Sequence, residues 1–165
     1  MPLQPAITDV EQVKNHPGLA RILAWNPAAV EAVKYDREEL TICIERSFIR
    51  EVCALLRNHL ECPFNFLSDV TCVDWYPSEP RFEVVYQLLS IPNKERLRLK
   101  VRLDGSSPVV ESVTSVWPAA NFFEREVFDL FGIRFSGHPY LRRIQMPEDW
   151  EGHPLRKDYP VEGYR

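Results

Sequence analysis

Carboxylates and histidines gather in the last third of the 165-residue sequence, and these side chains are the ones best able to do chemistry. Glu124, Glu126 and Asp129 lie within six residues. Two neighbouring carboxylates can serve as a general acid and a general base. On a helix, however, Asp129 would also lie one turn from Arg125, and an exposed, ion-paired helix surface explains the cluster more simply. We therefore expect a structural role for these carboxylates.

A second group of side chains has the composition of a metal site. The candidate ligands are His138, Asp149, His153 and Asp158. Both histidines stand in Gly-His-Pro triplets within extended chain, and not four residues apart on a helix as two zinc-binding histidines often do. The cations Arg156 and Lys157 beside Asp158 are better suited to ion pairs, or to charged hydrogen bonds with the carbonyl groups of a partner. We therefore favour partner binding over metal binding.

The cysteines and the absence of nucleotide motifs argue against an autonomous enzyme. The four cysteines are Cys43, Cys53, Cys62 and Cys72. They are spaced ten, nine and ten residues apart, unlike the short Cys-x-x-Cys pairs of iron–sulfur and zinc sites. Each stands in an apolar run and is expected to be a small buried side chain in a reduced, cytoplasmic protein. The sequence has no P-loop, dinucleotide fingerprint or nucleophile elbow. We expect no catalytic, cofactor-binding or metal-binding residue in this chain.

Charge and hydropathy exclude two further classes. The net charge of −4 disfavours a nucleic-acid binder, which needs a basic surface. No apolar run of about 18 residues is present, so no membrane span is expected, and the N-terminus lacks the pattern of a secretory signal. The charge is uneven: residues 1–133 carry 14 basic and 19 acidic side chains, whereas residues 134–165 carry six and five. The last segment therefore differs in character from the body.

Hydrophobic periodicity predicts the elements that position these groups. Strands are expected at residues 30–35, 40–45, 66–75, 81–89 and 95–103, with a hairpin connection at 36–38. Residues 9–24 are expected to form one or two helical turns broken at Pro17. A further helix should begin at Ser47 as N-cap and carry an apolar stripe as far as Leu60, before Pro63. The pattern predicts an α+β fold, a mostly antiparallel sheet with helices packed on one face.

The strand at residues 95–103 is strongly amphipathic. Its leucine and valine side chains occupy one face, and the other face carries the cations Lys94, Arg96, Arg98, Lys100 and Arg102. Five aligned cations would suit an acidic partner, or a solvated face balanced by acids such as Glu83 on a neighbouring strand. We favour the solvated face.

The end of the chain is predicted to be an anchoring helix and a tail. Residues 118–131 should form a helix, with Pro118 in the first turn or a capping box of Asn121 with Glu124, stopped by Gly132 in a left-handed conformation. Residues 134–165 have prolines every six to eight positions and are dense in aromatic and arginine side chains. We predict a body of residues 1–133, with an uncharacterised segment at 1–29, and an extended partner-binding tail at 134–165.

The run EREVFDLFGIRFSGHPYLRRI (residues 124–144), continued by DWEGHPLRKDYP (149–160), resembles the signature of the family of C subunits of NADH–quinone oxidoreductase, bacterial complex I. The family also includes a mitochondrial counterpart and the chloroplast J subunit. Four earlier pieces agree in order: LSDVTCVDWYP (67–77), RFEVVYQLLS (81–90), RLRLKVRL (96–103) and SVTSVWPAANFFERE (112–126). The resemblance covers about residues 30–165, and the chain resembles a short form of the family.

The resemblance implies a structural subunit of the peripheral arm, on the cytoplasmic side of the bacterial inner membrane. It implies a tail that wraps the quinone-site subunit, which is the D subunit of the complex. FMN and iron–sulfur clusters would lie in neighbouring subunits of the proton-translocating NADH:quinone oxidoreductase, and this chain would hold none. The predicted partner-binding residues are Arg125, Asp129, His138, Arg142, Arg143, Trp150, His153, Arg156, Lys157, Asp158 and Tyr159.

Two alternatives stay open. One is the homologous scaffold subunit of a membrane-bound nickel–iron hydrogenase. The other is a free-standing acid–base or metal enzyme that uses Glu124 with Asp129, or His138 with His153. The identity of a co-purifying large subunit would separate the first from complex I, and turnover or bound metal in the isolated chain would support the second.

Overall fold

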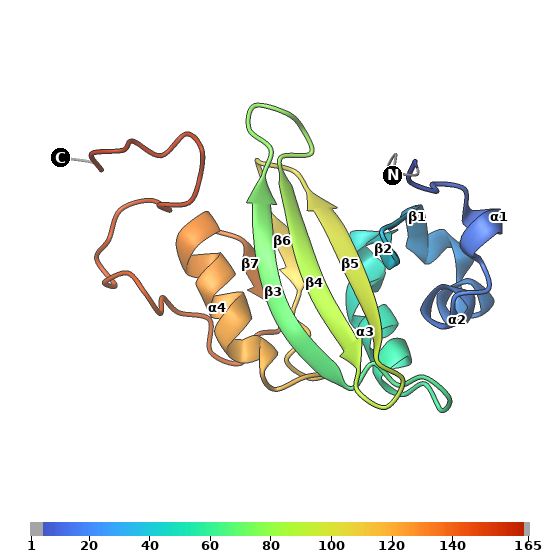
Figure 1. Cartoon of the computed structure of the whole chain (residues 1–165). Helices are drawn as coiled ribbons and strands as arrows, with labels where there is room; N and C mark the ends of the chain where they lie inside the picture. The colour runs from blue at the N-terminus through green and yellow to red at the C-terminus, as the bar shows by residue number, and fades with distance from the viewer. Residues whose placement is uncertain (1–4, 164–165) are drawn as a thin grey trace.

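Five strands form the main sheet of the computed structural model, which describes residues 5–163. The strands are β1 (Val30–Asp36), β2 (Glu39–Ile44), β3 (Phe66–Asp74), β4 (Phe82–Ser90) and β5 (Glu95–Leu103). They lie in the order β1-β2-β5-β4-β3, and neighbours are antiparallel except for the parallel pair β2 and β5 (Figure 1). The predicted α+β class and mostly antiparallel sheet are confirmed.

All five predicted strands are present, with bounds within one residue of the prediction. The connection between β1 and β2 turns at Arg37 and Glu38, whose φ angles of 52° and 66° are those of a two-residue hairpin turn. The parallel contact between β2 and β5 arises because α3, β3 and β4 separate them in the chain. The sequence pattern therefore located the strands, whereas their order in the sheet depends on the connection from β2 through α3, β3 and β4 to β5.

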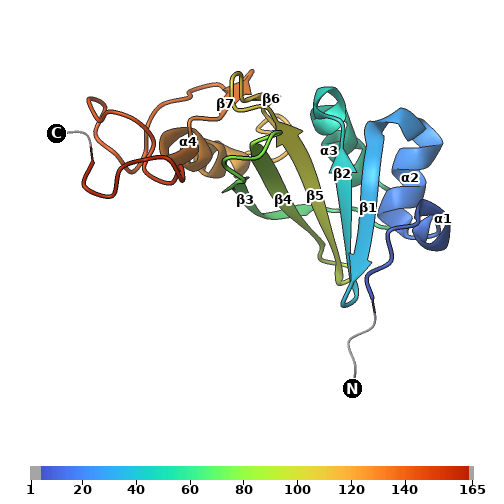
Figure 2. The same cartoon turned by 90° about the horizontal axis from the view of Figure 1, so that it is seen from above.

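The helices cover one face of the sheet, where the apolar side chains of β5 point. They are α1 (Val10–Val13), α2 (Pro17–Trp25), α3 (Ile49–Arg57) and α4 (Ala120–Phe131), with 3-10 turns at Pro27–Ala29 and Arg46–Phe48. Figure 2 shows α3 and α4 on the same side of the sheet. α2 approaches so closely that a Cβ added to Gly18 would lie 2.8 Å from Leu97 Cδ2. As predicted, Pro17 interrupts the first helical segment, and it begins α2.

Two helix starts differ from the prediction. Glu45, and not Ser47, caps the turn before α3: its carboxylate accepts the Ser47 N–H at 3.0 Å, and α3 begins at Ile49. α3 ends at Arg57, so Leu60 lies outside the helix with 97% of its surface exposed, and its place in the apolar stripe is wrong. α4 begins at Ala120 without a side-chain cap, because the Glu124 carboxylate points into the core.

A short parallel pair completes the body. β6 (Val109–Glu111) pairs with β7 (Arg134–Ser136), and neither strand was predicted because three residues are too few to show a period. After β7, residues 137–163 contain turns but no helix or strand, and they loop beyond α4 (Figures 1 and 2). Of the predicted N-terminal segment and tail, residues 1–4 and 164–165 lie outside the described residues.

The outward face of the sheet carries the predicted cations, and neighbouring acids balance most of them. Lys100 lies 2.6 Å and Arg102 3.5 Å from the carboxylate of Glu83, and Arg98 lies 2.6 Å from Glu39. The predicted balance by Glu83 is therefore confirmed, although the Glu83 side chain itself is buried. No helix within residues 5–163 is both long and apolar enough to span a bilayer.

Three of the four cysteines are buried, as the sequence predicts. They are Cys53, Cys62 and Cys72, whereas Cys43 is half-buried on the outward face of β2. Burial raises the pKa of the Cys53 thiol, and it raises the pKa of Cys72 to about 12. Both thiols are therefore protonated, and they act as small apolar groups in the core.

Candidate functional site

The segment of residues 137–163 folds back onto the C-terminal end of α4. The last carbonyl groups of a helix have no partner within the helix and carry the negative end of its dipole. Here the segment supplies partners: the Leu155 N–H donates to Leu130 O at 3.0 Å, and Arg156 Nε donates to Phe131 O at 2.6 Å. His153 Nδ1 donates to Asp129 O at 2.9 Å. The C-terminus of α4 is thus capped by residues far along the chain.

Asp129 is the centre of this contact, and its carboxylate is fully buried. One oxygen accepts the backbone N–H groups of Ile144, Gln145 and Met146, at 3.0, 2.7 and 2.9 Å. Burial alone would raise the pKa of Asp129, but these hydrogen bonds and the pairing with Arg143 outweigh burial and hold the pKa below its usual value. Asp129 is therefore an ionised anchor for the start of the segment.

The Arg143 guanidinium forms hydrogen bonds with three residues at the same time. Its Nη1 donates to the Asp129 carboxylate at 2.6 Å and to the Asp129 carbonyl at 3.1 Å. Its Nη2 donates to the carbonyl groups of Trp150 and Gly152, at 2.9 and 3.0 Å. From α4, Arg125 donates to the carbonyl groups of Arg142 and Arg143 at 3.2 and 3.1 Å. These planar, multidentate donors fix the path of the segment over residues 142–152.

Gly132 makes the close approach possible. As predicted, it ends α4 in a left-handed conformation, with φ of 75°. A Cβ added there would lie 2.5 Å from both Arg156 Nη2 and His153 Nε2. The position therefore requires glycine for its backbone and for the side chains that pack over it.

A second anchor ties the far end of the segment to the main sheet. Arg81 forms two hydrogen bonds with Asp74, at 2.9 and 2.8 Å, and two with Asp158, at 2.9 and 2.6 Å. The backbone N–H of Lys157 also donates to Asp74, at 2.9 Å. Burial would raise the pKa of Asp74, but Arg81 and the backbone donors lower it to about 2. Asp74 is thus ionised and joins the end of β3 to the tail.

Glu124 occupies a separate buried position on α4. Its carboxylate accepts hydrogen bonds from Ser112 Oγ at 2.6 Å and from the Val113 N–H at 2.7 Å. Burial raises its pKa to about 7, against the effect of these two bonds. Glu124 and Asp129 are both fully buried, so the expected exposed acidic surface is wrong, and Asp129 pairs with Arg143 in place of Arg125.

The two histidines lie at opposite ends of α4. His138 Nε2 donates to Asn121 O at 3.3 Å, whereas His153 contacts Asp129 O. Eight helical residues span about 12 Å, so the structure does not bring the two imidazoles together. Burial lowers the pKa of both histidines, which favours neutral rings that donate one N–H each. Residues 5–163 contain no group of three or more His, Cys, Asp or Glu placed to hold a metal ion.

The predicted partner-binding residues thus fall into two sets. The first set holds the segment to the body through side-chain contacts: Arg125, Asp129, His138, Arg143, His153, Arg156 and Asp158. The second set is formed by the four remaining predicted residues, which are Arg142, Trp150, Lys157 and Tyr159. The guanidinium of Arg142 lies 4.3 Å over the Tyr140 ring. We use "anchor residues" for the first set, together with Asp74 and Arg81. Sequence reasoning missed those two, because their partners Lys157 and Asp158 lie 83 and 77 positions further along the chain.

Several large apolar side chains along the segment remain exposed. They are Tyr140, Ile144, Trp150, Leu155 and Val161, and we call them the docking residues. The anchor residues fix the backbone beneath them, as for Leu155, whose N–H binds α4 while half of its surface is exposed. Exposed apolar side chains on a fixed backbone are typical of interaction surfaces.

Comparison with known proteins identifies the family. The model of the family described as "Respiratory-chain NADH dehydrogenase, 30 Kd subunit" matches residues 42–165. The chain belongs to this family. The C subunit of the NADH-quinone oxidoreductase of Roseiflexus sp. (strain RS-1) is 50% identical over 143 residues, covering 87% of this chain and 82% of the relative. The C subunit from Geobacter metallireducens is 50% identical over 137 residues, covering 82% and 83%. The resemblance found in the sequence is confirmed.

Two solved structures have the same fold. The trypsin-resistant fragment (1-134) of Nqo5 is 33% identical with a TM-score of 0.61, covering 75% of this chain and 99% of the fragment. A chain of the membrane-bound sulfane sulfur reductase, an archaeal respiratory membrane complex, is 28% identical with a TM-score of 0.73, covering 87% and 84%. The fold therefore also occurs in a chain of an archaeal respiratory membrane complex.

Proposed function

We propose that this chain is a structural subunit of the peripheral arm of a proton-translocating NADH:quinone oxidoreductase, and that its tail holds a neighbouring subunit in place. One observation carries the proposal: the tail is fixed to the body by contacts with the buried carboxylates of Asp129 and Asp74, while its large apolar side chains remain exposed. An unassembled protein gains nothing from this arrangement, whereas a partner would bury those groups.

The proposed neighbour of the tail is the D subunit, the quinone-site subunit, on the cytoplasmic side of the bacterial inner membrane. Electrons would pass from NADH through FMN and iron–sulfur clusters to quinone in the neighbouring subunits, and this chain would contribute no redox cofactor. Family membership supports the complex, and the resemblance of residues 124–160 to the family signature supports the partner. Electron transfer and quinone chemistry both need parts held in fixed positions, which a rigid subunit supplies.

The anchor residues make the docking surface rigid before it meets a partner. Ordering a side chain on binding costs about 0.5–1.5 kcal/mol, and ordering a whole disordered segment costs more. Arg143 and Arg81 already hold the segment at both ends, so little of this cost remains at assembly. We propose that the anchor residues act by positioning the tail and that the docking residues contact the partner.

Exposed Leu155 offers a direct test. Leu155→Asp keeps the backbone bond to Leu130 O but places a charge on the docking surface, so the chain should fold and assembly should fail. The measurement is the amount of each oxidoreductase subunit that co-purifies with the tagged chain, with circular dichroism as the check on folding. Leu155→Met is the matched control, because it keeps an apolar side chain of similar size. Full assembly of the folded Leu155→Asp chain would contradict the docking role.

The similarity to a chain of the sulfane sulfur reductase supports a second candidate, in which this chain belongs to a complex of that kind. The structural match to the reductase chain has a higher TM-score than the match to Nqo5, so the fold alone does not favour NADH–quinone oxidoreductase. Sequence favours NADH–quinone oxidoreductase, with 50% identity against 28%. The same purification decides between this complex, a reductase and the nickel–iron hydrogenase alternative, because the large subunit that accompanies the chain can be identified by mass spectrometry.

A further inference from the structure

A second exposed apolar surface lies at the other end of the main sheet. We call it the platform, and its residues are Leu60, Phe66, Leu89, Ile91 and Arg96. Three of them stand side by side on adjacent strands, since Phe66 pairs with Leu89 and Leu89 with Arg96. The tail is anchored at Asp74 and Arg81, where β3 ends and β4 begins, whereas the platform lies where β3 begins and β4 ends (Figure 1).

The platform is held in place by hydrogen bonds between two loops. His59 Nδ1 accepts the N–H groups of Glu61 and Cys62, at 3.1 and 3.0 Å, and fixes the loop that carries Leu60. Asn93 Nδ2 donates to Glu61 O at 3.2 Å and joins this loop to the turn between β4 and β5. Leu60, Ile91 and Phe66 are 97%, 56% and 47% exposed on this fixed frame. Their exposure is therefore a property of the folded body.

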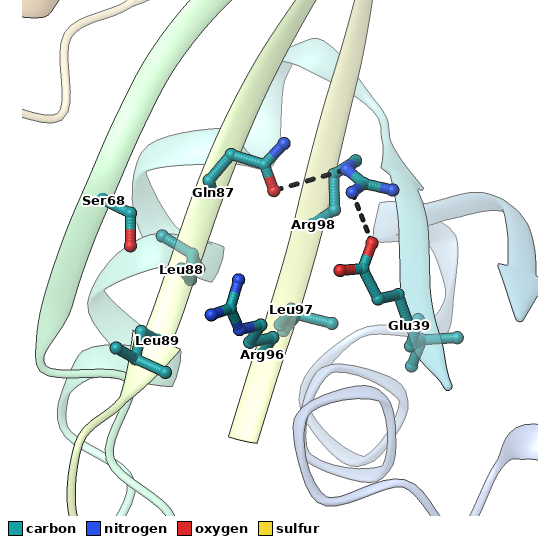
Figure 3. Close-up of a pocket in the computed structure, with 9 residues that line it drawn as sticks. Glu39, Ser68, Gln87, Leu88, Leu89, Arg96, Leu97 and Arg98 are labelled. Atoms are coloured by element: carbon teal, nitrogen blue, oxygen red, sulfur yellow. Dashed lines mark hydrogen bonds and ion pairs between the residues drawn. The ribbon is translucent and has the colours of Figure 1, made fainter. Parts of the chain in front are cut away.

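A polar hollow of about 220 Å³ adjoins the apolar side chains. Figure 3 shows Ser68, Gln87 and Arg96 on the adjacent strands β3, β4 and β5 around it. Arg98 lies at the same hollow, but Glu39 neutralises its charge at 2.6 Å and Gln87 accepts from it at 3.3 Å. Within residues 5–163, the Arg96 side chain forms no hydrogen bond or ion pair, whereas its backbone belongs to the ladder between β4 and β5.

This chemistry fits one kind of occupant. A single carboxylate can pair with the Arg96 guanidinium and accept from the Ser68 hydroxyl. Because Glu39 already pairs with Arg98, Arg96 is the cation of the hollow that remains for a partner. One cation suits a single acidic side chain within a protein segment better than an anionic membrane surface, which binds clusters of cations. We propose that the platform receives a segment of a second subunit of the same complex, one that carries an acidic side chain next to an apolar one. The inference rests on the proposed function, and it makes this chain a bridge between two neighbours.

Photocrosslinking in the intact complex tests the position of the partner. A benzophenone amino acid replaces Leu60 in one version of the full chain and Trp150 in another, and the crosslinked peptides are sequenced by mass spectrometry. Position 60 should join an identified subunit at a peptide that contains Asp or Glu beside an apolar residue, and position 150 should join a different subunit. Crosslinks from both positions to one subunit would overturn the proposal. Crosslinks from position 60 to lipid, to a second copy of this chain or to nothing would overturn it as well.

Charge reversal tests the chemistry. Arg96→Glu should lower the occupancy of the crosslinked subunit by about tenfold or more, because it replaces a charge-assisted pair with two like charges. Arg21→Glu, the same change on exposed α2, is the control and should leave occupancy unchanged. Changing the partner's acidic residue to lysine should restore binding to Arg96→Glu. Normal occupancy with Arg96→Glu overturns the platform alone, whereas a wild-type chain that brings down no oxidoreductase subunit overturns the proposed function and the platform together.

Discussion

Replacing Glu124 with glutamine should change how the stability of the chain depends on pH. Glu124 is fully buried on α4, and burial raises its pKa from the usual 4.5 to about 7. Each pKa unit corresponds to about 1.4 kcal/mol, so the difference amounts to about 3 kcal/mol of folding free energy. Glutamine can keep both contacts, accepting the Val113 N–H and donating to Ser112 Oγ, without a charge.

The direction follows from the two protonation states. Below about pH 4.5, Glu124 is protonated in the folded and the unfolded chain, and its ionisation has no effect on stability. As the pH rises towards 7, the unfolded chain releases this proton while the folded chain keeps it. Above pH 7 the folded chain must hold a buried carboxylate, and the full penalty applies. The wild-type chain should therefore lose about 3 kcal/mol relative to Glu124→Gln between pH 4.5 and 8.

Urea unfolding of both proteins at several pH values, followed by tryptophan fluorescence, measures this difference. Groups other than Glu124 titrate alike in the two chains, so their contributions cancel in the comparison. Glu126→Gln is the matched control, because it makes the same change at an exposed position of α4, where the carboxylate accepts from Gln145 Nε2 at 2.6 Å. A stability difference between wild type and Glu124→Gln that does not vary with pH would refute the assignment of a buried, titrating carboxyl group.

Two changes at the tail should separate anchoring from folding. Arg143→Ala leaves the buried Asp129 carboxylate without its cation, at a cost of about 3–5 kcal/mol, and should raise hydrogen exchange and trypsin cleavage over residues 137–163 before the body unfolds; unchanged protection there would contradict the anchor. Gly132→Ala and Gly137→Ala place a Cβ at nearly equal φ, 75° and 77°, at a cost of about 1 kcal/mol each. Only at position 132 would the Cβ meet a neighbour, 2.5 Å from His153 Nε2, so equal loss of stability in urea unfolding of the two variants would refute the packing of the tail over α4.

The sequence predicted the elements whose pattern extends over several residues. Each of the five strands was located to within one residue, and the alternation of apolar and polar positions is clearest along β2 and β5. Gly132 was predicted to end α4 because glycine readily adopts the left-handed conformation that often follows the last turn of a helix. Hydrophobic periodicity alone could not predict β6 and β7, because these strands have three residues each and form by pairing with one another. It also extended α3 to Leu60, although the helix ends at Arg57.

The site was harder to predict because its contacts join distant parts of the chain. The sequence identified the tail residues by type but could not show that Arg143 turns back to Asp129, or that Asp158 reaches Arg81 across 77 positions. It also placed Glu124 and Asp129 on an exposed surface, since charged residues usually lie there. Their burial follows from partners supplied by the loop before α4 and by the tail after it, which no local pattern reveals.

Anchor and docking residues should respond differently to substitution. Removing an anchor such as Arg143 should loosen the segment in the isolated chain and should weaken assembly as a result, since the docking residues lose their fixed frame. Removing a docking residue such as Leu155 should weaken assembly and leave the isolated chain unchanged. Hydrogen exchange in the free chain, compared with subunit occupancy in the purified complex, places each residue in one class. An Arg143 variant that lowers occupancy without loosening the tail would show that Arg143 contacts the partner directly.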